Sequence, residues 1–457
     1  MVRTVTMKNR DLTQGSVLKA LIYFAIPFVI ANILQSLYGA VDLFVVGQFC
    51  SVESVAAVST GTQVTQIVTS LAAGLTLGGT VLIGEYTGAK NYEKVKRTIG
   101  TALTCFAVFA VIVSAMLLIF RRPLLRLLRA PAESFELTVV YVSICACGTV
   151  FICGYNAISA VLRGYGDSKR PMMFVGIACV LNIILDFFFV GALRMGVAGT
   201  ASATVIAQAT SMFIAVAYLK KHDFLFDFKP RSFIPDKYLV KRLITVGVPI
   251  SFQELMVRIS FLYLMVVMNR SGVHAASIIG IGAKFDIFSM LAGTSLASAT
   301  AAITAQNLGA GKPERARRSL VYALTCAVAV AAVFFLWAQI APERMIGVFT
   351  DDPETIRVGV PYFRSCSFDY LFVAMVFVMN GYLNGCQKTV WTMCSNTFSA
   401  LCLRIPGLWY VGAHYPSDLG MLGRVAPLVT GIMVVYTAIL LIVMRRRLAR
   451  RLLQAEK

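Results

Sequence analysis

The sequence predicts an all-α polytopic membrane protein, with twelve transmembrane helices forming two pseudo-twofold-related six-helix bundles around a central cavity. Two observations predict this fold class. Of the 457 residues, 58% are hydrophobic and only 14% are charged, whereas soluble domains are nearer half apolar and a quarter charged. The apolar residues also gather in runs of about twenty or more, long enough to cross a hydrocarbon core of roughly 30 Å.

The first apolar run, from Val17 to Val46, is too long for a signal-peptide core and lacks a small-residue cleavage site. We therefore expect it to be retained as a span. The eleven Cys residues lie mostly inside the apolar runs and form no CxxC pair, which favours small buried hydrophobes over a metal or redox site. The predicted spans are 18–46, 54–82, 98–120, 136–160, 172–193, 197–219, 241–268, 275–305, 319–340, 358–383, 390–412 and 424–444.

The formal charge of +20 is explained by where Lys and Arg lie. An even number of spans puts both termini on one side. That side holds 29 of the 42 Lys and Arg and the opposite loops hold 9, when basic residues at the first two positions of a span are counted with the adjoining loop. The positive-inside rule makes that side cytoplasmic. One opposite loop goes against the bias, and a short amphipathic helix at the interface would account for it; its basic residues are Arg121, Arg122, Arg126 and Arg129.

These charges predict a multi-pass protein of the plasma membrane, or of the inner membrane in a bacterium, with both termini in the cytoplasm. The basic cytoplasmic loops can attract anionic lipids of the facing leaflet. We expect no nucleic-acid partner, because the positive charge orients helices, and we expect the chain to act as a monomer.

An internal duplication divides the chain. Residues 88–105 and 309–326, which are 221 positions apart, share eight of eighteen residues. Pro27 and Pro249, one residue off this register, interrupt the first helix of each repeat and predict a kink there. Six spans in each repeat make the repeats parallel. The predicted domains are an N-terminal lobe at 1–219, a cytoplasmic linker at 220–240, a C-terminal lobe at 241–444 and a basic cytoplasmic tail at 445–457.

Two repeated bundles around a midplane cavity are typical of secondary transporters that work by alternating access. The stretch Gly309–Lys312 is followed by Pro313 and lacks the Ser or Thr of a nucleotide-binding loop, so ATP on this chain is not expected to drive transport. An intramembrane enzyme is not expected either, because the three His residues lie in loops or at helix edges; they are His222, His274 and His414.

Two acids within the spans are the candidate coupling residues, because a carboxylate in a membrane is costly and marks an ion or substrate path. Asp42 lies late in the first span and Asp186 late in the fifth, with Asn182 one turn earlier on the same face. Thr204 lies about as deep in the sixth span, roughly 10–12 Å below the outer end. All four side chains can meet in the outer half of the N-terminal lobe.

The duplication argues that these acids serve a dedicated cation site. The corresponding positions in the second repeat carry no acid; they are Tyr263, Leu403, Gly407 and Val425. Core packing alone would not require acids on one side only. Hydrogen bonding between packed helices is the alternative role for Asp42 and Asp186.

The chain resembles the multidrug and toxic compound extrusion (MATE) family over nearly its whole length. The resemblance rests on YGAVDLFVVGQF after Pro27, on LNIILDFFFVGALRMGVAGTASATVIAQ, on GIGAKFDIF and on AQNLGAGKPERARRS. It implies a twelve-helix antiporter that exports cationic or amphipathic compounds in exchange for H⁺ or Na⁺. It also implies an N-lobe site for H⁺ or Na⁺, and no other cofactor, at Asp42, Asn182, Asp186 and Thr204.

The second lobe supplies weaker candidates for substrate contact. Glu254 and Arg258 are four apart on one helix, where pairing with each other is the alternative. Lys284 with Asp286 occupies a motif that the resembling family often shows, so Lys284 is either a movable counter-charge or half of a plain ion pair. Asp369 falls about a turn from the equivalent family acid. Some members of that family carry a cation-site Glu on this helix, nearer the position of Val257, so we do not assign that role to Glu254.

A flippase for a lipid-linked precursor is the alternative function, since its relatives share a similar repeat architecture. A cavity for a pyrophosphate would need several basic residues within the spans. Only four lie within the spans away from their ends, and the first two have acidic neighbours; the four are Arg258, Lys284, Arg364 and Arg404.

Overall fold

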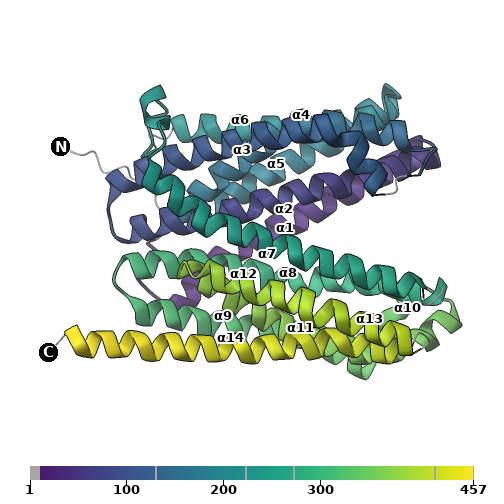
Figure 1. Ribbon diagram of the computed structural model, residues 1–457. Helices are drawn as coiled ribbons and strands as arrows, with labels where there is room; N and C mark the ends of the chain where they lie inside the picture. Colours follow the sequence, from purple (N-terminus) through teal and green to yellow (C-terminus); the bar gives the residue numbers. More distant parts are fainter. Residues whose placement is uncertain (1–10, 129–130, 222–223, 271–272, 416–417, 456–457) are drawn as a thin grey trace. The chain divides into compact units, whose positions relative to one another are not determined.

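The computed structural model describes residues 11–128, 131–221, 224–270, 273–415 and 418–455, and these residues are helical apart from short connections (Figure 1). Eleven of the described helices are long and apolar enough to cross a membrane. The helices are α1 (Val17–Phe49), α2 (Val52–Gly88), α3 (Tyr92–Leu127), α4 (Phe135–Gly164), α5 (Lys169–Asp186), α6 (Gly196–Lys221), α7 (Lys237–Arg270), α8 (Val273–Gly309), α9 (Pro313–Ile340), α10 (Pro342–Gly347), α11 (Pro353–Gly385), α12 (Thr389–Phe398), α13 (Ile405–His414) and α14 (Leu419–Ala455).

The eleventh predicted span, 390–412, is divided by a π-helical stretch. Helix α12 leads directly into η3 (Ser399–Arg404), which leads into α13. A similar π-helix, η1 (Phe187–Ala192), follows α5 and completes the fifth predicted span. A π-helix inserts an extra residue into the helical turn and is frequently found at functional sites. Both π-helices therefore lie in the fifth spanning segment of a repeat.

The duplication is visible in the backbone of the turns. Lys90 after α2 and Gly311 after α8 both have a positive φ, 55° and 70°, and so do Gly166 after α4 (96°) and Gln387 after α11 (58°). Each pair is separated by the offset of 221 residues found in the sequence. A left-handed residue ends a helix by turning the last backbone groups toward new partners. The two repeats thus end their second and fourth helices in the same way.

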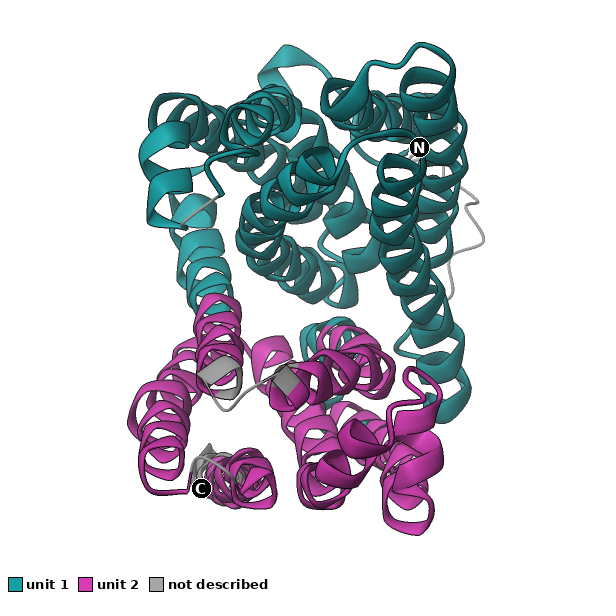
Figure 2. Cartoon of the chain, turned by 90° about the vertical axis from the view of Figure 1, so that its right-hand side faces the viewer, with its two compact units in different colours: residues 1–252, 302–315 teal, residues 253–301, 316–457 magenta. Residues whose placement is uncertain are grey.

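Figure 2 shows that the chain forms two compact units. Unit 1 comprises residues 1–252 and 302–315, and unit 2 comprises 253–301 and 316–457. Unit 1 therefore includes the start of α7 and the end of α8, which belong to the second sequence repeat. In unit 1, α4 packs against α2, α3 and α6, and α1 packs against α5. In unit 2, α11 packs against α14.

The linker between the repeats is docked on α3. It contains the short 3-10 helix η2 (Pro230–Phe233), and Phe226 within it is buried. Thr104 donates a hydrogen bond to the carbonyl of Phe233 over 2.6 Å. Between the linker and the first turns of α3 lies a pocket of about 460 Å³. Residues 222–223 of the predicted linker lie outside the described residues.

Helix α3 is longer than its predicted span. It continues through Pro123 to Leu127, so Arg121, Arg122 and Arg126 belong to its last turns. The short interface helix expected here is therefore wrong, while Arg129 lies outside the described residues. Arg122 pairs with Glu136 at the start of α4 over 2.7 Å. Helix α14 continues into the predicted basic tail, and the side chains of residues 447–457 lie outside the described part.

Candidate functional site

The four side chains predicted to form a cation site come from three helices of unit 1. Helix α1 supplies Asp42, α5 supplies Asn182 and Asp186, and α6 supplies Thr204. All four are buried, with exposed fractions of 3%, 0%, 0% and 6%. Helix α1 packs against both α5 and α6, which brings the three backbones together. Two carboxyl groups are thus enclosed among apolar helices.

Direct contacts connect these residues. The hydroxyl of Thr204 donates a hydrogen bond to Oδ2 of Asp42 over 3.4 Å. Asp42 also interacts with Asp186 and Asn182. Tyr38, one turn before Asp42, donates from its hydroxyl to the carbonyl of Thr204 over 3.5 Å. Asp42 is the member of the group that contacts the other three.

Several polar atoms of this group have unused hydrogen-bonding capacity. Oδ1 of Asp42, both carboxyl oxygens of Asp186 and the side-chain amide of Asn182 have no hydrogen-bond partner among the described residues. Buried polar atoms without partners are costly, and each one calls for an explanation. Carboxylate, amide and hydroxyl oxygens are hard ligands that suit a small cation. The donor set fits H⁺, taken up by a carboxyl, or Na⁺, held by oxygens.

The backbone changes form immediately beside the site. Asp186 is the last residue of α5, and the next six residues form η1. Within η1, the Leu193 amide donates to the carbonyl of Phe188 over 2.9 Å. This i→i+5 pattern rotates the following side chains relative to a continued α-helix. Sequence reasoning missed the π-helix, because the residues Phe187–Ala192 are as apolar as the helix before them.

Unit 2 has a different charged cluster. Asp369 of α11, which is buried, forms an ion pair of 4.0 Å with Arg404 at the end of η3, whose side chain is 12% exposed. The Arg404 guanidinium lies over the ring of Phe261, 4.5 Å from its centroid. Asp286 of α8 interacts electrostatically with both Asp369 and Arg404. Arg404 was not among the predicted site residues, although an arginine inside a predicted span was the signal that could have identified it.

The other predicted residues of unit 2 do not join this cluster. Glu254 and Arg258 of α7 interact with each other electrostatically. Arg258 is exposed, and so is Lys284 of α8. Lys284 and Asp286 are two residues apart, so they point to different faces of the helix. Asp286 and Asp369 are therefore the predicted residues of this unit that the structure brings together.

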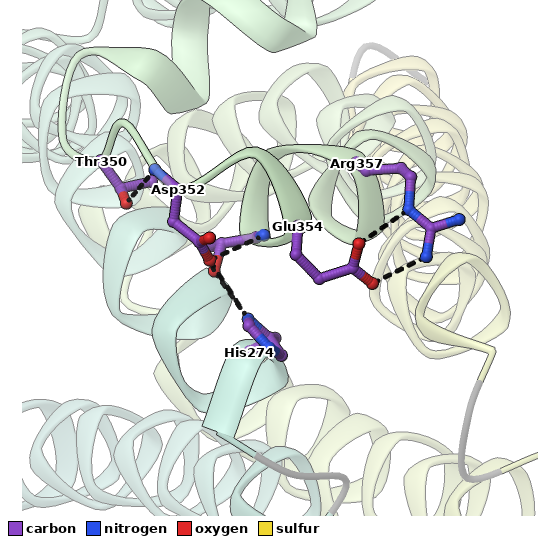
Figure 3. Close-up of polar contacts among 6 residues, drawn as sticks. His274, Thr350, Asp352, Glu354 and Arg357 are labelled. Carbon is purple, nitrogen blue, oxygen red and sulfur yellow. Dashed lines mark hydrogen bonds and ion pairs between the residues drawn. The ribbon is translucent and has the colours of Figure 1, made fainter.

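His274 lies at a helix edge, as expected, and connects α8 with the start of α11 (Figure 3). Its Nδ1 lies 2.9 Å from the Thr355 hydroxyl and 3.3 Å from Oδ2 of Asp352. Asp352 is the N-cap of α11 and accepts from the Thr355 amide over 3.0 Å. Hydrogen bonds from the Thr355 hydroxyl and amide hold the pKa of Asp352 below its usual value. These contacts fasten a helix end and form no catalytic arrangement.

The class defined by this fold and site is a polytopic membrane transporter with a buried acidic cluster. The MatE family model matches the chain twice, over residues 27–188 and 249–410. The chain therefore belongs to the MATE family, whose members are transporters and not enzymes. Each match begins at one of the two helix prolines, Pro27 and Pro249.

Related proteins cover most of this chain. The probable multidrug resistance protein YpnP of Bacillus subtilis is 27% identical over 400 residues, which are 88% of this chain and 89% of that protein. The probable multidrug resistance protein YoeA of the same organism is 26% identical over 92% of this chain and 91% of its own length. An outward-facing multidrug resistance MATE transporter matches the fold with a TM-score of 0.87 and 22% identity, covering 94% of this chain and 96% of that one.

Proposed function

We propose that this protein is a secondary active antiporter that exports cationic or amphipathic compounds in exchange for H⁺ or Na⁺. The coupling site is the group Asp42, Asn182, Asp186 and Thr204. The observation that carries this proposal is a buried pair of carboxyl groups, three of whose four oxygens lack hydrogen-bond partners among the described residues. A site built only for helix packing would be expected to satisfy these atoms.

The electrostatics of the pair provide a mechanism for coupling. Two neighbouring carboxylates in an apolar environment repel each other, and each loses hydration, so their full ionisation is unfavourable. A proton or a sodium ion bound between them removes the repulsion. The free energy gained by binding this cation differs between conformations that hold the two acids at different separations. Only such a difference in binding free energy can shift a conformational equilibrium. Helix α1, which contains both Asp42 and Pro27, is the element that we expect to move.

The substrate class is inferred from the relatives and from unit 2. Related proteins are named as probable multidrug resistance proteins. In unit 2 the cluster of Asp286, Asp369 and Arg404 has two acids for one base, so it favours a cationic group. We assign Asp286 and Asp369 to substrate contact, and Glu254 and Arg258 to a mutual pair. Exposed Lys284 remains a candidate counter-charge.

The same proposal places the protein in the plasma membrane with both termini in the cytoplasm. The basic loops then face the leaflet in which anionic lipids attract Lys and Arg. Its partners are the small cationic substrate and the lipid bilayer, with no nucleic acid, and the chain works as a monomer. A flippase activity has less support, because Arg258 is exposed and Arg404 is already paired with Asp369.

Efflux from proteoliposomes tests the proposal. The purified protein is reconstituted, and ethidium transport is driven separately by a pH gradient and by a sodium gradient. We expect one of the two gradients to drive transport, which identifies the coupling ion. Glu93→Gln is expected to transport like wild type, because Glu93 is an acid outside the proposed coupling site and its side chain is 71% exposed. Transport driven by neither gradient would contradict the antiporter.

A further inference from the structure

The residues before α1 form a docked segment. Leu12 and Thr13 are 2% and 6% exposed. Asp11 folds the segment into a tight turn by accepting from the Thr13 amide over 2.8 Å and from the Gln14 side chain over 2.8 Å. Burial raises the pKa of Asp11, but the Thr13 hydrogen bonds and the charge of Lys312 outweigh burial and lower it overall. Ser16 then caps α1. We call residues 11–16 the entry segment.

Basic and amide side chains at the α8–α9 turn hold the entry segment through its backbone. Arg315 donates to the carbonyls of Gln14 and Gly15, each over 2.6 Å, and to that of Leu12 over 3.4 Å. Lys312 donates to the carbonyl of Thr13 over 2.9 Å. Asn307 donates to the carbonyl of Leu12 over 3.3 Å. Hydrogen bonds from charged donors are stronger than neutral ones, and Arg315 supplies most of them.

The first repeat holds the start of α7 in a corresponding way. Arg242, in the second turn of α7, donates to Glu85 over 2.8 Å and to the Tyr86 hydroxyl over 2.7 Å. Adding the offset of 221 residues to Glu85 and Tyr86 gives Gln306 and Asn307. Each repeat therefore uses the end of its second helix to hold the start of the other repeat's first helix. All of these residues belong to unit 1.

Two equivalent glycines allow this crossed arrangement. A Cβ on Gly88 would lie 1.9 Å from the carbonyl oxygen of Gln306, and a Cβ on Gly309 would lie 1.9 Å from that of Glu85. Real Cβ atoms do not approach an oxygen so closely, so no other residue fits without a shift of the backbone. Gly88 and Gly309 are again 221 residues apart. The ends of α2 and α8 thus cross in direct backbone contact.

We propose that Arg315, with Lys312 and Asn307, is a positioning group for α1: it latches the start of the helix that bears Asp42 and must release it during transport. The latch joins the first helix of one repeat to the second and third helices of the other. Alternating access requires such elements of the two repeats to move relative to each other at one face. The inference rests on the proposed transport function, since release matters only if α1 moves in a cycle.

Because the entry segment accepts these hydrogen bonds through backbone carbonyls, the test replaces the donor, Arg315. Arg315→Ala, Arg315→Lys and the exposed control Arg318→Ala are compared with wild type in lipid nanodiscs, using full-length protein. Hydrogen–deuterium exchange is measured over residues 11–20. In Arg315→Ala we expect exchange in this segment to accelerate roughly tenfold or more, since local opening loses the charged hydrogen bonds. Arg315→Lys is expected to restore part of the protection, and Arg318→Ala is expected to match wild type.

Ethidium transport by the same variants reports the positioning role. A destabilised latch favours the state open at the latch side, so the KM for ethidium offered from that side falls. The maximal rate falls as well, because the latch must re-form in every cycle. A purely structural defect would lower the amount of active protein without lowering the KM. Partial rescue of both values by Arg315→Lys is expected.

Each outcome decides the proposal. Unchanged exchange in Arg315→Ala would show that the entry segment is not held by Arg315. If Arg315→Ala exchanges faster but has the same KM and maximal rate as the control Arg318→Ala, then Arg315 holds the entry segment without a positioning role in transport. If wild-type protein transports ethidium under neither gradient, the proposed function fails and the positioning role fails with it, while the exchange data still decide whether Arg315 holds the segment.

Discussion

The hydroxyl of Thr204 on α6 donates to the carboxylate of Asp42 on α1, over 3.4 Å, in the buried part of unit 1. This bond joins α1, the helix that we expect to move, to α6, which packs on α5. It also leaves Oδ1 of Asp42 without a partner among the described residues. Asp42 is thus oriented by one oxygen and available to a cation through the other.

Thr204→Val removes the hydroxyl while keeping the side-chain shape. We expect the apparent affinity for the coupling ion to fall roughly fivefold, which corresponds to about 1 kcal/mol for a long hydrogen bond to a carboxylate. Thr204→Ser is expected to retain wild-type affinity. The affinity is measured as the ion concentration that gives half-maximal ethidium efflux. Thr69→Val is the control, because the Thr69 hydroxyl donates within its own helix, to the carbonyl of Thr65. An equal loss in both variants would refute the role of Thr204.

The contribution of the Asp369–Arg404 ion pair of unit 2 to stability can be tested by double mutation. Arg404→Gln leaves the buried Asp369 carboxylate without its partner, and Asp369→Asn leaves the half-buried Arg404 guanidinium without its partner. Each variant is therefore expected to cost about 1–3 kcal/mol of stability. The double variant is expected to lose at least about 1 kcal/mol less than the sum, since contacting residues are not additive. Thermal unfolding in detergent measures all three. Additive losses would mean that the 4.0 Å pair does not couple.

The linker packs so closely on Gly100 of α3 that a methyl group at this position is expected to destabilise the protein. A Cβ on Gly100 of α3 would lie 1.8 Å from the carbonyl oxygen of Ser232. Gly100→Ala is therefore expected to displace the linker and to destabilise the protein by about 1–3 kcal/mol. Gly47→Ala is the matched control, because nothing lies within 4 Å of its Cβ position. That change is expected to be neutral or stabilising by up to about 1 kcal/mol, since alanine favours a helix.

The cap of α11 predicts a pH dependence of stability. The Thr355 hydrogen bonds lower the pKa of Asp352 in the folded protein. A lowered folded-state pKa gives stability that is fully present above the unfolded-state pKa and is lost as the pH falls through the folded value. The difference in melting temperature between wild type and Asp352→Ala is thus expected to be fully present at about pH 5 and to shrink below about pH 4. A difference that grows between about pH 5 and about pH 3 would contradict this explanation.

Sequence patterns predicted the spanning helices and the four residues that meet around Asp42. They predicted them because long apolar runs and the rare acids within them are strong signals. The π-helices beside Asp186 and Arg404 gave no such signal, since lipid and protein neighbours are equally apolar and the hydrophobic period carries little information there. The holding of residues 11–16 by Arg315 was also beyond prediction, because the acceptors are backbone carbonyls that any sequence has.

The most direct test of the coupling site separates movement of substrate from its energisation. Ethidium counterflow, with ethidium on both sides and no ion gradient, is measured alongside gradient-driven efflux for wild type, Asp42→Asn and Asp186→Asn in proteoliposomes. An Asn side chain has nearly the shape of Asp but cannot ionise, so it cannot take up and release a cation. We therefore expect both variants to fold, to retain ethidium counterflow and to lose the response to either gradient. Gradient-driven efflux at the wild-type rate in either variant would contradict coupling through Asp42 and Asp186.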